Sequence, residues 1–225
     1  MPLNRDECVE VLKVFLERHP DIENKLDFII AENDIELYGK PANIMAGYSS
    51  YPEKSSKFQG RVSITASKFH EKQDLYMAIN HEVLGHYGLN TFSPRDKKLL
   101  LDTIIANKDQ DDFKLQWKEI EAHYGDKNIY EQAEEIFAIA TEDIYPYTYP
   151  KLEQINEKGT QAFDDVCYFK QPLTQERLFA ITDMVALGIR ENTRQQQTFA
   201  ENDITLLSRQ TMHQEPDDPE PEMTM

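Results

Sequence analysis

The stretch HEVLGH, residues 81–86, decides how this chain of 225 residues is to be understood. It places the imidazoles of His81 and His86 five positions apart, with the Glu82 carboxylate beside the first. Imidazole nitrogen is a common zinc ligand, and a carboxylate next to the metal can take a proton from a metal-bound water. The segment therefore predicts a metal site on a helix.

The spacing of the two histidines also predicts a local distortion of that helix. The familiar zinc-binding pattern is H-E-x-x-H, and one residue is extra here. On a regular α-helix with a step of about 100° per residue, positions i and i+5 lie about 140° apart. Both nitrogens must approach within about 2.1 Å of one zinc ion. We therefore expect a π-type bulge, or an early helix end, near Gly85.

Length and cysteine usage indicate a single cytoplasmic domain. A chain of this size can bury one sizeable core, and we expect one domain over residues 1–200 with its centre at about 44–145. Cys8 and Cys167 lie far apart and fit no disulfide or metal framework, which favours a reducing compartment. Neither a signal peptide nor a long apolar run is present, so we expect a soluble, cytoplasmic protein without a membrane segment.

The charge balance argues against nucleic acid as a partner. The chain has 24 Lys and Arg residues against 41 Asp and Glu residues, a net charge of −17. Such a chain repels phosphate backbones, so a nucleic-acid partner is predicted to be unlikely. Residues 201–225 form an acidic tail whose last part, Gln214–Met225, has three prolines and five acids. We expect this tail to be disordered, either as a solubilising segment or to recruit a partner.

The hydrophobic pattern predicts an α+β fold, in which a small antiparallel sheet precedes a mostly helical body. Residues 44–48 and 61–65 are expected to be strands joined by a long hairpin. Residues 26–30 and 35–38 also look extended, as short strands or a mixed loop. Helices are expected from the Asn4 cap to Pro20, from about 71 through the motif, over 94–106, 111–123 and 129–144, and after Thr174 through Ile189. The prolines of segment 145–150 must break a helix.

A third metal ligand is expected on a later helix, because catalytic zinc usually takes three protein ligands. The pair Glu134 and Glu135 runs directly into the apolar segment IFAIA, residues 136–140. A helix that is apolar on nearly every side is buried, and a buried carboxylate needs a positive partner. Zinc would be such a partner. Arginine or lysine would serve too, and so would water if Glu135 faced outward.

Two motifs resemble those of the dipeptidyl peptidase III family: HEVLGH resembles its HExxGH zinc motif, and residues 134–138 are similar to its E-E-x-x-A motif. In that family both histidines and the second glutamate of the pair bind zinc, which implies His81, His86 and Glu135 as ligands. The glutamate after the first histidine acts on the catalytic water, which implies that role for Glu82. The chain departs from the family in its short length, in lacking the large second lobe, and in having Phe137 where the motif has Arg.

A closer resemblance covers about Ala46 to Asp143. The order Gly47-Tyr48, residues 60–65, the segment HEVLGHYGL and then AEEIFA resembles the zincin-like metallopeptidase domain found within large polyvalent proteins of phages and plasmids. This resemblance implies a zincin-like fold, a metal site and an origin in a mobile element.

Together these features predict a zinc-dependent metallopeptidase or amide hydrolase that acts on a peptide or protein. Zinc (Zn2+) would lower the pKa of its bound water toward about 7, and Glu82 would be the general base. Glu134 is a candidate to orient a ligand histidine. The oxyanion donor stays open among four residues, which are Tyr87, His123, Tyr124 and Tyr145.

Two alternatives remain beside the enzyme. In the first, zinc staples helices together in a non-catalytic interaction module of a mobile genetic element. In the second, no metal binds, and His81 and His86 are packing or capping residues of an acidic helical adaptor. The substrate and the oligomeric state are not determined by the sequence.

Overall fold

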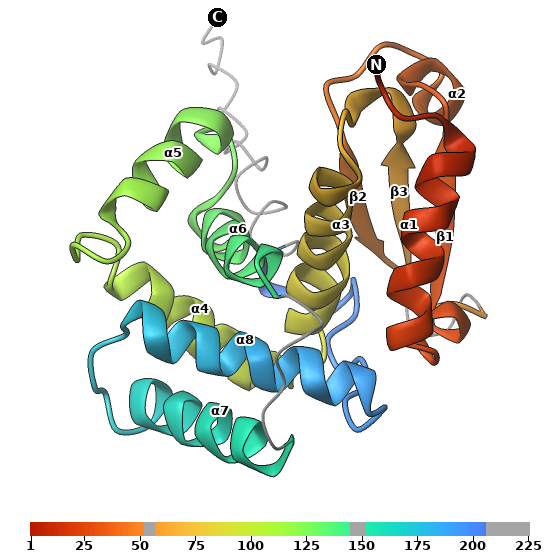
Figure 1. Ribbon diagram of the computed structural model, residues 1–225. Coiled ribbons are helices and arrows are strands. Elements are labelled where there is room, and N and C mark those ends of the chain that lie inside the picture. The colour runs from red at the N-terminus through yellow and green to blue at the C-terminus, as the bar shows by residue number, and fades with distance from the viewer. Residues whose placement is uncertain (52–56, 145–151, 206–225) are drawn as a thin grey trace, which may run out of the picture.

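A three-stranded sheet forms one end of the molecule (Figure 1). The computed structural model describes residues 1–51, 57–144 and 152–205. Its strands are β1 (Leu26–Ala31), β2 (Ala46–Ser50) and β3 (Gly60–Thr65), in the spatial order β1-β3-β2. The central strand β3 pairs antiparallel with β2, which confirms the predicted pairing of these two segments.

The sheet is mixed rather than wholly antiparallel, because β3 pairs parallel with β1. After β1 the chain makes a short helix, α2 (Asp34–Tyr38), and places β2 at the far edge, so β3 returns between the two in the direction of β1. The extended conformation expected at 35–38 is therefore wrong. The Asn33 side chain caps α2 by accepting from the Glu36 N–H, and Gly39 ends it with φ of 70°.

Helices make up most of the remaining chain. Their bounds are α1 (Arg5–Arg18), α3 (Lys72–Asn80), α4 (Pro94–Ala106), α5 (Lys114–Tyr124), α6 (Ile129–Glu142), α7 (Leu152–Cys167) and α8 (Gln175–Arg190). The predicted Asn4 cap is confirmed as a full capping box with Glu7, and α4 has the predicted bounds. The α+β class is confirmed.

Helix α7 was not predicted, although Ile155, Phe163 and Val166 recur on it at helical spacing. Gly159 lies on the side of α7 that packs against α8. A Cβ there would lie 2.3 Å from Cβ of Met184. The absence of a side chain thus lets the two helices pack as a hairpin.

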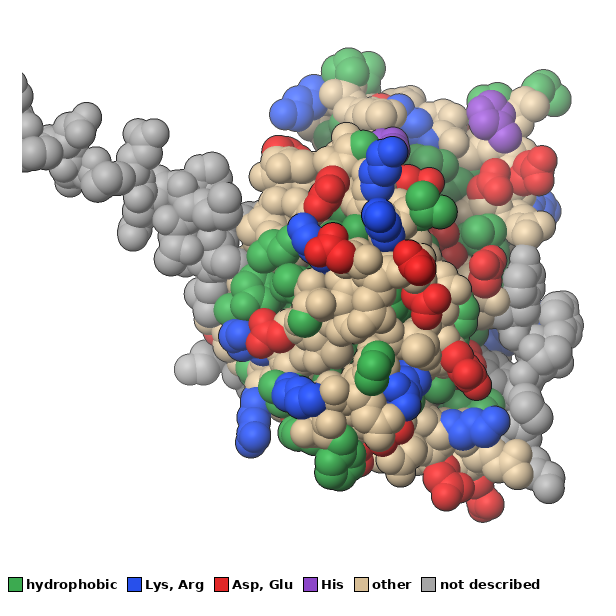
Figure 2. Space-filling view, turned by 90° about the vertical axis from the view of Figure 1, so that its left-hand side faces the viewer, with side chains coloured by type: hydrophobic (Ala, Val, Ile, Leu, Met, Phe, Trp, Pro, Cys, Tyr) green, Lys and Arg blue, Asp and Glu red, His purple; other side chains and the backbone are tan. Residues whose placement is uncertain are grey.

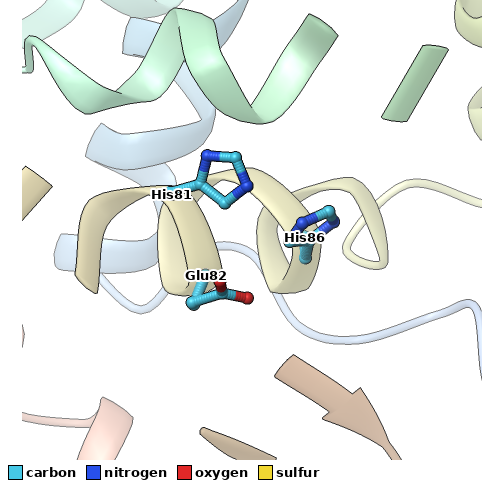
Figure 3. Close-up of side chains that lie close together, drawn as sticks. All are labelled: His81, Glu82 and His86. Atoms are coloured by element: carbon cyan, nitrogen blue, oxygen red, sulfur yellow. The ribbon is translucent and has the colours of Figure 1, made fainter. Parts of the chain in front are cut away.

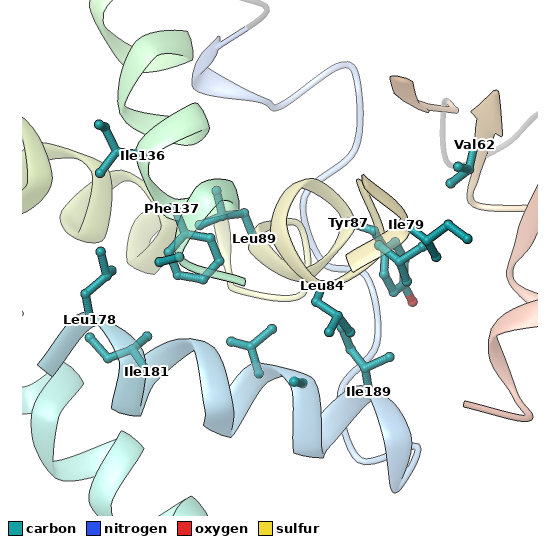
Figure 4. Close-up of a cluster of buried hydrophobic side chains, with 14 of the residues drawn as sticks. Val62, Ile79, Leu84, Tyr87, Leu89, Ile136, Phe137, Leu178, Ile181 and Ile189 are labelled. Carbon is teal, nitrogen blue, oxygen red and sulfur yellow. The ribbon is translucent and has the colours of Figure 1, made fainter. Parts of the chain in front are cut away.

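One hydrophobic cluster joins the sheet to the helices, with the HEVLGH segment at its centre (Figure 4). Ile79 near the end of α3, Leu84 within this segment and Tyr87 directly after it lie between Val62 of β3 and Ile189 of α8. In the described residues, no helix is long and apolar enough to cross a membrane. The predicted helix break at 145–150 and residues 206–225 of the predicted tail lie outside the described part of the chain.

Candidate metal centre

The HEVLGH segment forms a π-helix, which confirms the predicted distortion. Helix α3 runs without a break into η3 (His81–Tyr87), whose seven residues are π-helical. In a π-helix the backbone hydrogen bonds connect residues five apart, so side chains five apart come to the same side. The ring centroids of His81 and His86 lie 5.0 Å apart, and Figure 3 shows both rings and Glu82 on this turn.

Gly85 allows η3 to lie directly against α6. A Cβ on Gly85 would be 2.6 Å from both Cα and Cβ of Ala138. Because one of these atoms is backbone, a larger residue at position 85 would require the helix itself to move. The close approach of η3 and α6 is what carries the α6 carboxylates to the imidazoles.

Glu135 reaches both predicted histidine ligands. Its Oε2 lies 3.3 Å from Nε2 of His81 and 3.9 Å from Nε2 of His86. Two ligand atoms of a tetrahedral zinc ion bound at about 2.1 Å are on the order of 3.4 Å apart. Glu135, named from the sequence, thus lies close to both histidines, and its 3.3 Å distance from His81 is near that value.

Glu82 forms a second possible ligand group with the two histidines. His81, Glu82 and His86 each offer a possible ligand atom, and these atoms all lie within 4.8 Å of one another. The Glu82 side chain is buried, although a carboxylate is rarely buried without a positive partner. The structure therefore contains a His–Glu–His group that could hold a metal ion.

A carboxylate stands behind each imidazole. Oε1 of Glu142 lies 2.9 Å from Nδ1 of His81, and Oε1 of Glu134 lies 3.5 Å from Nδ1 of His86. With Nδ1 as the protonated nitrogen, both Nε2 atoms are left to face Glu135, as in carboxylate–histidine–metal arrangements. The predicted place of Glu134 beside a histidine agrees with this geometry. Glu142 was missed, although it lies seven residues, about two turns, after Glu135 on α6.

Two lysines balance the carboxylates from the outer side. Nζ of Lys127 lies 2.7 Å from Oε1 of Glu135, and Nζ of Lys97 lies 3.3 Å from Oε1 of Glu134. The Lys97 side chain is fully buried, and its ammonium also lies 3.0 Å from Asp203 of the C-terminal segment. Lysine was predicted as one possible partner of these glutamates, but neither Lys97 nor Lys127 was predicted individually.

The electrostatics of the cluster favour positive charge at its centre. Burial alone would lower the pKa of His81, but hydrogen bonds that its ring donates to the Glu135 and Glu142 carboxylates outweigh it and raise that pKa to about 10. Burial alone would raise the pKa of Glu134, but the Lys97 ammonium and an imidazole outweigh it and hold that pKa at about 2. A cluster that holds its carboxylates ionised and stabilises a cationic imidazole is suited to a metal cation.

The predicted oxyanion donors are scattered. The Tyr87 hydroxyl donates to Oε1 of Gln59 at 3.0 Å, and His123 is exposed on α5. Tyr124 packs with its ring under the Lys127 ammonium, 4.2 Å from the ring centroid. Tyr145 lies outside the described residues.

Fold and site together define an α+β protein with a buried cluster of histidine and glutamate suited to a metal ion. Its sequence is similar to that of DNA primase TraC from Escherichia coli, with 32% identity over 209 residues, or 88% of this chain. The chain spans only 14% of the length of that relative. No protein-family model and no solved structure matches the chain.

This similarity contradicts the predicted activity. The prediction of a zinc metallopeptidase or amide hydrolase with a peptide substrate and Glu82 as general base is wrong, because the relative is named a DNA primase. The physical reason is that the HEVLGH constellation specifies where a cation can bind but does not specify a reaction.

The prediction that nucleic acid is an unlikely partner is contradicted by the same relative. A net charge of −17 sums over the whole chain, and residues 206–225 alone contribute five acids and one arginine. Binding depends instead on the local arrangement of charge. Figure 2 shows Lys and Arg side chains interspersed with Asp and Glu over one face.

Proposed function

We propose that this chain is a metal-binding module, without peptidase activity, that serves a larger DNA-priming protein of a mobile genetic element. The observation that carries the proposal is the similarity to DNA primase TraC, which covers 88% of this chain but 14% of the relative. A match of that kind is expected for one module within a much longer protein. The resemblance to zincin-like domains then describes the metal-binding turn rather than a reaction.

Zinc is the ion that the donor set fits best. Two imidazoles and a carboxylate are typical zinc ligands, and Oε2 of Glu135 lies near Nε2 of both His81 and His86, which supports this choice. These ligands come from two elements, η3 and α6, so a bound ion would hold the π-helical turn against α6. When bound, zinc would supply structural stability rather than a nucleophile.

Glu82 is proposed as the fourth ligand. A structural zinc site is closed by four protein ligands, whereas a catalytic site leaves one position to water. Glu82 is buried and lies within 4.8 Å of both histidines, measured between possible ligand atoms. This assignment separates the module from an enzyme, because a general base stays off the metal while a ligand contributes to affinity.

Metal binding tests the first part of the proposal. Zinc affinity of the full chain is measured by competition with a chromophoric chelator, for the wild type, Glu82→Gln and the exposed control His123→Ala. We expect Glu82→Gln to weaken zinc binding by roughly tenfold or more, which is the loss expected when a metal ligand or a group that supports one is removed. The control should leave the zinc affinity unchanged. Cleavage of a peptide library by the wild type, lost selectively in Glu82→Gln, would overturn the proposal.

DNA binding tests the second part. Fluorescence anisotropy of a labelled single-stranded oligonucleotide, titrated with the zinc-loaded full chain, should show binding that weakens as salt is raised. A single-stranded RNA of the same sequence and a polyglutamate peptide serve as controls for nucleic-acid type and for charge. No binding to DNA at low salt would contradict the proposed service to a DNA-priming protein.

A further inference from the structure

A cavity lies beside the start of α4 and shares no lining residue with the metal centre. Its volume is about 320 Å³, and its walls come from residues 91–96, from α7 and α8, and from the segment that follows α8. Ser93, Thr160, Thr193 and Arg194 are among the residues that line the cavity, and the three hydroxyls donate to groups of the protein itself. Such a volume is at the lower end of the range for small-molecule sites and exceeds what a bare anion needs.

Arg194 is held in place on three sides. Its Nε donates to Oγ1 of Thr91 at 2.8 Å, and its guanidinium carbon lies 4.2 Å from the ring centroid of Phe92. Its aliphatic stem rests on Gly188, where a Cβ would lie only 2.4 Å from Cγ of the arginine. The guanidinium is thus positioned before any ligand arrives, which reduces the entropy lost on binding.

This guanidinium forms no ion pair in the described part of the chain, although the Asp96 carboxylate is close enough to raise its pKa. No carboxylate lies within ion-pair distance of it, and its two terminal nitrogens have no hydrogen-bond acceptor there. Asp96 lines the same cavity, but its two carboxylate oxygens accept from the hydroxyls of Ser93 and Tyr168, each at 2.8 Å. Burial lowers the pKa of Arg194 to about 10, which shows the cost of keeping its charge there.

An unpaired and partly buried guanidinium is unusual in a chain that carries 41 acidic residues. A phosphate group would satisfy both terminal nitrogens through a bidentate contact. The wall hydroxyls and the volume leave room for a sugar and a base beside the phosphate.

We propose that this cavity binds the phosphate of a nucleotide, with Arg194 as the residue that grips it. The inference does not depend on the metal centre, and it rests on the proposed function only for the choice of a nucleotide. Asp96 opposes an anion, so the phosphate is placed on the Arg194 side of the cavity and the sugar and base toward Asp96 and Thr160. Removing the negative charge of Asp96 should therefore change the affinity in the opposite direction to removing the positive charge of Arg194.

The test uses the zinc-loaded full chain and three probes: inorganic phosphate, deoxyadenosine 5′-monophosphate, and a 5′-phosphorylated oligothymidine of about ten nucleotides. Calorimetry measures affinity, and the NMR signal of the Arg194 Nε–H reports contact. We expect Arg194→Gln to weaken nucleotide binding by roughly tenfold to a hundredfold, and Arg194→Lys to weaken it less. Asp96→Asn should tighten binding a few-fold, on the order expected for removal of a nearby like charge.

The matched control is Arg177→Gln, which removes the same charge from the opposite end of α8, where the arginine bonds to neighbouring groups. This control should bind the nucleotide as the wild type does. Equal weakening in Arg177→Gln and Arg194→Gln would overturn the proposal, and so would phosphate binding as tightly as the nucleotide. The absence of binding to all three probes would overturn it as well.

The outcomes separate this inference from the proposed function. If the oligonucleotide binds and Arg194→Gln has no effect, the service to DNA stands and the cavity assignment fails. If the mononucleotide binds through Arg194 but the oligonucleotide does not bind, the cavity assignment stands and the service to DNA fails.

Discussion

Helices α6 and α8 both pack against the π-helical turn η3, but α6 contributes charged side chains to the contact and α8 contributes apolar ones. Helix α6 meets η3 at Gly85, where the added Cβ would touch Ala138, and carries Glu135 to the imidazoles. Helix α8 lies beside the end of η3 at Gly88, where the added Cβ would touch Cγ1 of Val185. One contact brings charge into the interior, and the other brings only hydrocarbon.

The difference shows how the molecule can bury a charged site. Desolvating several ionised groups is costly, and the ammonium groups of Lys97 and Lys127 compensate for part of this cost at the η3–α6 contact. The η3–α8 contact needs no such compensation, since burial of a side chain such as Val185 stabilises the fold by roughly 1.5–3 kcal/mol. We infer that α8 stabilises the position of η3 through apolar packing and that α6 supplies the carboxylates of the proposed metal centre.

Removing a histidine should have the largest effect on the α6 side. We expect His81→Ala or His86→Ala to weaken zinc binding by roughly a thousandfold, because a zinc site shares about 10–16 kcal/mol among its few ligands. Chelator competition measures the affinity. Val185→Ala on the α8 side should leave the affinity unchanged and lower the free energy of unfolding by about 2 kcal/mol. A similar loss of zinc in all three variants would show that the two contacts do not have separate roles.

The two glycines give the next largest contrast. At Gly85 the added methyl would meet helix backbone at 2.6 Å, whereas at Gly88 it would meet the end of a side chain at 2.8 Å. We expect Gly85→Ala to lower the free energy of unfolding by about 1–3 kcal/mol and to weaken zinc binding more than Gly88→Ala does. Urea unfolding and zinc competition measure the two quantities. A greater loss of zinc affinity in Gly88→Ala would contradict the account.

Glu142→Gln tests the carboxylate behind His81. Its hydrogen bond at 2.9 Å fixes the ring, so zinc affinity should fall by about tenfold to a hundredfold while the fold stays intact. The exposed neighbour Asp143 provides a matched control, since Asp143→Asn removes the same charge one position away. Equal effects of the two substitutions would indicate a general electrostatic effect instead of an oriented ligand.

Local features of the sequence were enough to predict much of this arrangement. The spacing of His81 and His86 predicted the π-helical turn, because two ligands five residues apart cannot meet on a regular helix. Asn4 and Pro94 predicted helix starts, since caps and prolines act within a few residues. The glutamate pair at 134–135 predicted a partner for the motif, because charge next to an apolar run needs compensation.

The missed features depend on contacts between distant segments. The parallel pairing of β1 with β3 depends on where β2 is placed, and the role of Lys97 depends on Asp203, which is 106 residues away. Helix α7 is stabilised by its contact with α8 at Gly159, a residue that weakens an isolated helix. The activity was predicted wrongly because similar metal ligands serve many functions.

The smallest expected effect concerns His19, a buried imidazole that, unlike His81, has no carboxylate beside it in the described part of the chain. His19 is buried against Phe15, 4.3 Å between ring centroids, and burial lowers its pKa to about 4. Since the unfolded chain then binds the proton first, stability should fall by about 1 kcal/mol as pH drops from 6.5 to 5.5. Urea unfolding of the wild type and His19→Leu measures this slope, with the exposed His70→Ala as control. The same slope in His19→Leu would assign it to other groups.

The central claim is that η3 and α6 together form a metal centre, and histidine NMR of the full chain tests it most directly. Adding zinc to 15N-histidine-labelled protein should show one bound ion, with His81 and His86 bound through Nε2 and still protonated at Nδ1. Less than about a tenth of an equivalent of bound zinc, or imidazole signals that do not change on its addition, would contradict the claim.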